Sequence, residues 1–100
     1  MHGVTDLVDG VYLYNLHPGS ILDVETRSRH YRVEYMGGDE IRISGHPDYC
    51  PYPVRAELLG SLGSNGVVHG FLGRGMRLEY CRLSDGLPVI TSVINNIREN

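Results

Sequence analysis

The sequence contains no lysine and no tryptophan, and it has only two cysteines and one phenylalanine among its 100 residues. All nine basic residues are therefore arginines. Arginines provide planar forks for carboxylates or phosphates, but here they are scattered along the chain, which favours codon usage as the explanation. The formal net charge of −3 argues against a general nucleic-acid-binding protein, because such proteins are normally basic.

Long apolar runs are also absent. No segment approaches the ~20 apolar residues that a membrane-spanning helix needs. The first residues, Met1–Asp6, contain neither a basic residue nor an apolar run, which predicts that they are not a secretory signal. We therefore expect a cytoplasmic protein without membrane contact. Cys50 and Cys81 are too few for a disulfide framework, so we expect free thiols.

Length and composition predict one folded unit. The hydrophobic content of 41% and the charged content of 21% are typical of ordinary globular chains. A chain of 100 residues forms one core and has no room for a second. We assign residues 1–100 to one all-β domain with residues 1–9 and 96–100 as flexible ends. One helical turn around Val4–Val8 is the alternative for the N-terminal end.

The clearest strand pattern follows a glycine-rich stretch. Gly70–Gly75 contains three glycines, and the apolar Met76, Leu78 and Tyr80 then alternate with more polar residues. Period-two alternation is typical of a half-buried strand, because successive side chains point to opposite faces. We predict that Met76–Leu83 is the longest, central strand, entered through a glycine corner.

Similar patterns predict the remaining strands. These are Val11–Leu16, Ile21–Thr26, Tyr31–Met36, Glu40–Ser44, Val54–Leu59 and Leu87–Ile94, while Val67–His69 is either a short strand or a bulge. Turns are expected at His17–Ser20, Arg27–His30, Gly37–Asp39 and Ser84–Gly86. A short helix is the alternative for Val54–Leu59, and Gly60–Gly66 is expected to be flexible. The predicted fold is all-β, a small antiparallel barrel or sandwich of six to seven short strands.

The segment Gly45–Pro53 breaks the strand pattern. Its three prolines exclude a helix and cannot donate to a central ladder, so we expect an irregular surface connection. Functional residues often lie on such loops. The sequence leaves open whether the two loop tyrosines are exposed anchors or fold back over the barrel end. A ligand site at one barrel mouth would use His46, Tyr49, Cys50, Tyr52 and Arg74.

Metal binding and nucleophilic catalysis are weaker interpretations of the same loop. His46 and Cys50 have tolerable spacing for half of a zinc site, but His69 and Cys81 do not form the close second pair that structural zinc sites show. A Cys50 nucleophile with His46 or His30 as its base would need an activating positive charge or helix N-terminus, and no helix is predicted. We therefore predict no metal, no cofactor and no catalytic residues.

The glycine-rich stretch Gly70–Gly75 has two interpretations. Successive backbone N–H groups in a glycine turn can form an anion nest, to which Arg74 would add charge. The glycine order differs from that of a dinucleotide-binding loop, however, and no helix follows. Because glycines before a strand often mark a bulge or a barrel corner, we favour the structural interpretation.

Arg27–Arg32 is the one basic and aromatic cluster. Single-strand nucleic-acid binders combine such charges with rings on which bases stack. Here the candidate contacts are Arg27, Arg29, Tyr31 and Arg32. Asp23, Glu25 and Glu34 lie on strands that we expect to pair beside this cluster, so cross-strand charge pairs are favoured. Nucleic-acid binding is therefore the second alternative function.

The leading functional prediction is a non-enzymatic binding or self-association module, with a homo-oligomer as the expected assembly. No catalytic constellation is recognisable in the sequence. Leu87–Ile94 carries apolar residues of both parities, which suggests two partly buried faces, and such strands often need a partner to cover them. A small-ligand or enzymatic pocket at the barrel mouth is the first alternative, and its ligand is not identified by the sequence.

Overall fold

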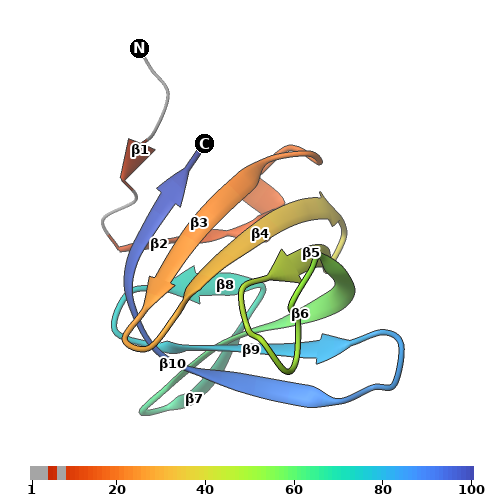
Figure 1. Cartoon of the computed structure of the whole chain (residues 1–100). Helices are drawn as coiled ribbons and strands as arrows, with labels where there is room; N and C mark the ends of the chain where they lie inside the picture. Colours follow the sequence, from red (N-terminus) through yellow and green to blue (C-terminus); the bar gives the residue numbers. More distant parts are fainter. Residues whose placement is uncertain (1–4, 7–8) are drawn as a thin grey trace.

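A computed structural model describes residues 5–6 and 9–100 of the chain (Figure 1). It contains short antiparallel strands and one 3-10 turn. The elements are β1 (Thr5–Asp6), β2 (Gly10–Tyr12), η1 (Leu13–Asn15), β3 (Ile21–Thr26), β4 (His30–Gly37), β5 (Glu40–Ser44), β6 (Val54–Gly63), β7 (Gly66–His69), β8 (Phe71–Gly73), β9 (Arg77–Arg82) and β10 (Pro88–Glu99).

Antiparallel pairing closes the main sheet into a ring (Figure 1). Strands β3, β4, β5 and β6 pair in sequence order, β6 pairs with β9, β9 with β10, and β10 returns to β3. Strand β1 adds to β10 and β7 adds to β6, while β2 and β8 form a separate ribbon. The predicted all-β class and small antiparallel barrel are therefore confirmed.

The interior of the ring is filled by the apolar side chains of the alternating strands. Leu22 and Val24 of β3 are buried, as predicted for that strand. The same parity rule holds in β4, β5 and β9, where the buried residues are Tyr31, Val33, Tyr35, Ile41, Ile43, Leu78 and Tyr80. One face of each strand is thus removed from water, which fixes the register of the whole sheet.

Two long strands bend so that each pairs with different neighbours along its length. The register of β6 against β9 shifts between Leu58 and Gly60. Gly60 has φ of +144°, and a Cβ atom there would lie 2.1 Å from the carbonyl oxygen of Val68. Strand β10 shows comparable register shifts between Ile90 and Val93 against β9. Such bulges turn the corners that allow a small barrel to close.

The structure corrects several predicted elements. The longest strand is β10 with 12 residues, followed by β6 with 10, whereas β9 has only 6. The predicted strand Val11–Leu16 stops at Tyr12 because η1 follows. The predicted flexible segment Gly60–Gly66 is instead the paired β6–β7 hairpin. Gly60 therefore marks a bulge within the continuous strand β6 and does not end that strand.

The last strand also differs from its prediction. Strand β10 continues to Glu99 and pairs there with β3 and β1, so residues 96–99 are not a free end. Both parities of this strand carry buried residues, Val89 and Thr91 on one and Ile94 on the other, which agrees with the prediction of two partly buried faces even though Ile90 is 51% exposed. At the N-terminal end, Thr5–Asp6 is a strand, and the helical turn proposed around Val4–Val8 falls mainly outside the described residues.

Candidate functional site

The proline loop, residues 45–53, is a closed turn. The backbone N–H groups of Gly45 and His46 donate to the carbonyl of Cys50 over 2.9 and 3.2 Å, and the N–H of Cys50 donates back to His46 over 3.0 Å. The His46 Nδ1 atom accepts the backbone N–H groups of Asp48 and Tyr49 over 3.1 and 3.3 Å. The loop was predicted to be irregular, and these bonds give it one defined shape.

Cys50 anchors the loop to the barrel interior. Its side chain is fully buried, and its Sγ atom lies 3.5 Å from the Tyr80 hydroxyl. Burial, followed by the contact with Cys50, raises the pKa of Tyr80 well above the usual phenol range. Tyr80 therefore stays protonated beneath the loop.

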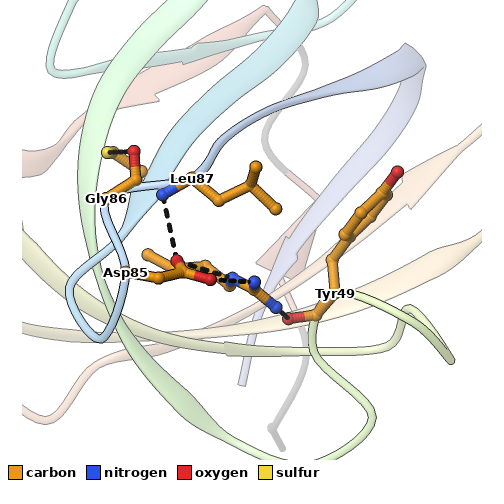
Figure 2. A network of polar contacts seen from close by, with 6 residues as sticks. Tyr49, Asp85, Gly86 and Leu87 are labelled. Atoms are coloured by element: carbon orange, nitrogen blue, oxygen red, sulfur yellow. Dashed lines mark hydrogen bonds and ion pairs between the residues drawn. The ribbon is translucent and has the colours of Figure 1, made fainter.

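Arg82 joins the proline loop to the β9–β10 hairpin (Figure 2). Its Nη1 atom donates to the Tyr49 carbonyl over 3.0 Å, and its Nε atom donates to Asp85 Oδ1 over 3.2 Å. The backbone N–H of Leu87 donates to the same Oδ1 atom over 3.0 Å. The Arg82 bond, and then the Leu87 bond, lower the pKa of the Asp85 carboxyl.

Sequence analysis did not identify Arg82 or Asp85 as site residues. The available signal was an arginine three residues before an aspartate in an Asp-Gly turn, a spacing that permits a local ion pair. Nothing in the sequence indicated that the same guanidinium reaches Tyr49, which lies 33 positions away.

A surface cavity of about 280 Å³ lies between three segments of the chain that are distant in sequence. These are the proline loop, the β3–β4 hairpin and the first half of β10. The lining residues are Ser28, Arg29, Tyr31, His46, Tyr49, Val89, Ile90, Thr91 and Ser92. The His46 and Tyr49 rings lie 4.5 Å apart at this cavity, tilted by 36°.

The structure does not bring the five predicted ligand residues together. His46 and Tyr49 line this cavity, while Cys50 is buried beneath the loop. Tyr52 is 69% exposed and lines a different groove of about 470 Å³, so it does not fold back as a lid. Arg74 lies in the β8–β9 turn, and its backbone N–H donates to the Asp9 carbonyl.

The predicted nucleic-acid residues are also divided. Arg29 and Tyr31 line the cavity, but Tyr31 is buried, so its ring is not available for stacking on a base. Arg32 stands directly opposite Asp23. His30 stands opposite Glu25. Arg27 is exposed at the hairpin, and its backbone N–H donates to Val93 of β10.

The glycine corner uses its backbone N–H groups within the protein. Those of Arg74, Gly75 and Met76 donate to the carbonyls of Asp9, Ile94 and Gly73 over 3.1, 2.8 and 3.2 Å. Gly75 has φ of +79°, which the turn requires. Because these donors are occupied, the turn has no anion nest and serves to redirect the backbone into β9.

Residues 5–6 and 9–100 contain neither a metal-binding cluster nor a membrane-spanning helix. No group of three or more His, Cys, Asp or Glu side chains in this part is close enough to hold a metal ion. Both cysteines, which lie in this part, are free thiols. None of its elements is a helix of the length and hydrophobicity needed to cross a bilayer.

Comparison with known proteins gives this chain no relatives. No family model, no curated protein and no solved structure matches it.

Proposed function

We propose that this domain is a non-enzymatic binding module that self-associates through one end of the barrel. We call this end the loop-end surface and define it by the proline loop and by residues 82–90, which include the β9–β10 turn. The predicted homo-oligomer would form by contact between two such surfaces.

The distribution of exposed apolar side chains carries this proposal. Among the described residues, six large hydrophobic side chains are exposed, and four of them belong to the loop-end surface. These four are Tyr49 at 39%, Tyr52 at 69%, Leu83 at 49% and Ile90 at 51% exposure. Exposed apolar groups that gather in one region favour association, because contact removes their area from water.

The two grooves beside Leu83 support a second copy as the partner. One groove, of about 470 Å³, is lined by Tyr52, Val54, Arg55, Leu83 and Ser84. The other, of about 330 Å³, is lined by Gly37, Asp39, Glu40, Ala56, Glu57 and Leu83. Arg55 of the first groove already pairs with Glu40 of the second within one chain over 2.7 Å, so this arginine is not left for a partner. A two-fold axis near Leu83 would instead bring the Leu83 side chains of two copies together.

Sedimentation velocity over a range of protein concentrations tests the proposal. The sedimentation coefficient of the wild type should rise with concentration. Leu83→Glu places a charge at the centre of the contact and should weaken self-association by roughly 30-fold or more. The matched control is Tyr14→Ser, because Tyr14 is 73% exposed but lies outside the loop-end surface.

Two results would overturn self-association through the loop-end surface. The first is a wild-type protein that remains monomeric at the highest concentration reached. The second is equal association by the Leu83→Glu and Tyr14→Ser variants, which would mean that the contact lies elsewhere.

A further inference from the structure

The cavity between the proline loop, the β3–β4 hairpin and β10 carries several hydrogen-bond donors without an acceptor. The guanidinium of Arg29 has no carboxylate partner among the described residues, and no Asp or Glu lines the cavity. The Tyr31 hydroxyl has no hydrogen-bond partner among these residues either. Because no unpartnered side-chain oxygen there is fully buried, this hydroxyl is reached by solvent.

His46 and Ser92 add two further donors. The Nδ1 atom of His46 accepts two backbone N–H groups, so the neutral ring carries its hydrogen on Nε2. The Ser92 Oγ atom accepts the N–H of Ser28 over 3.1 Å, which leaves its own hydrogen available. Thr91, by contrast, is satisfied, because its hydroxyl donates to the Ser92 carbonyl and accepts the N–H of Leu78. Donors without acceptors are the arrangement that a bound anion requires.

The pKa of Tyr31 is consistent with a protonated hydroxyl that can donate to a bound anion. Burial, and then the neighbouring Cys50, raise the pKa of Tyr31, and the charge of Arg29 only partly opposes this shift. The phenol therefore remains a protonated donor. Arg29 and Tyr31 both line this cavity.

Apolar groups form the rest of the wall. Val89 is buried, Ile90 is half exposed, and the Tyr49 ring stands against the His46 ring. At about 280 Å³, the cavity is slightly smaller than typical pockets for drug-sized ligands. It therefore suits a molecule with a few carbon atoms or one ring attached to the anionic group.

We propose that this cavity binds a small monocarboxylic acid, with the carboxylate held by Arg29, Tyr31 and His46 and the apolar body against Tyr49 and Ile90. A single negative charge is favoured because Arg29 is the one permanent cation among the described residues that line the cavity. This site goes beyond self-association, since all of its walls belong to one chain.

Titration with benzoate, followed by amide chemical shifts in a nitrogen-15 NMR spectrum, tests the proposal. Benzoate should shift the amides of the three lining segments and should bind at least about tenfold more tightly than its neutral analogue benzamide. Arg29→Gln should weaken benzoate binding by about tenfold, and Tyr31→Phe by about fivefold. The matched control is Arg32→Gln, since Arg32 is an exposed arginine on β4 that does not line the cavity.

Three outcomes would contradict the carboxylate site. They are equal binding of benzamide and benzoate, unchanged binding by Arg29→Gln, and tighter binding of phenyl phosphate than of benzoate. Repeating the titration with Leu83→Glu separates the two proposals. Benzoate binding by a monomeric wild type would refute self-association alone, and self-association without benzoate binding would refute the carboxylate site alone.

Discussion

The barrel interior and the loop-end surface use similar residue types in opposite ways. In the interior, Leu78 and Tyr80 are fully buried, and the Tyr80 hydroxyl has a partner in Cys50. On the loop-end surface, Leu83 and Tyr52 are exposed to water. The apolar groups and the tyrosine hydroxyl of the interior already have their contacts within the fold. The loop end, in contrast, leaves apolar side chains and hydrogen-bond donors accessible to a partner or a ligand. This difference is what directs both functional proposals to the loop end.

The largest expected effect on the unfolding free energy comes from disrupting the bulge at Gly60, where β6 bends. Gly60→Val would add a side chain where a Cβ atom lies 2.1 Å from a backbone carbonyl and φ is +144°. The combined strain and overpacking should cost about 4 kcal/mol or more of unfolding free energy, measured by urea denaturation. Gly63→Ala is the control on the same strand, because its Cβ would meet only the flexible end of Met76. Equal destabilisation by the two variants would contradict this account of β6.

Leu78 and Leu83, which are five positions apart, test the difference between the barrel interior and the loop-end surface. Leu78→Ala removes a fully buried side chain and should cost about 3 kcal/mol of unfolding free energy. Leu83→Ala removes a side chain that is 49% exposed and should change the unfolding free energy by less than about 0.5 kcal/mol. The same Leu83→Ala variant should self-associate more weakly than the wild type. A large loss of stability from Leu83→Ala would show that this residue belongs to the core.

The smallest expected effect concerns the connection between the proline loop and the hairpin. Arg82 lowers the pKa of Asp85 in the folded protein, so the unfolded state binds more protons at acidic pH. The stabilisation is therefore present above the ordinary carboxyl pKa and is lost as pH falls below about 4. Thermal melts should show Asp85→Asn less stable than the wild type at pH 6, with the difference shrinking on acidification.

Asp48→Asn is the matched control for that experiment. Asp48 lies in the proline loop, and its carboxylate has no partner among the described residues, so this variant should match the wild type over the whole pH range. A difference between Asp85→Asn and the wild type that is constant from pH 6 to strongly acidic pH would exclude the carboxylate as its source.

The sequence predicted the interior well because alternation is a local property. The strand Ile21–Thr26 and the turn at Gly37–Asp39 were both located from neighbouring residues alone. One error occurred where glycine interrupted the pattern. Gly60 was taken as a sign of flexibility, but it permits a close approach between two paired strands. Only the identity of the approaching strand reveals that role.

The candidate site was predicted only in part, because its members come from separate segments. His46 and Tyr49 were identified from the proline loop, and Arg29 and Tyr31 from the basic cluster, but as two unrelated sites. Their common cavity depends on the pairing of β3 with both β4 and β10. Arg74, which was placed with the loop, belongs to a turn that contacts Asp9 instead.

By itself, the sequence determined that this chain forms antiparallel strands with one apolar face each, because side-chain alternation and turn residues act over a few neighbouring positions. Tertiary structure alone decided which strands close the ring, which apolar residues remain exposed around Leu83, and which donors meet beside Arg29. These features depend on contacts between residues far apart in the chain, and local patterns carry no information about such contacts.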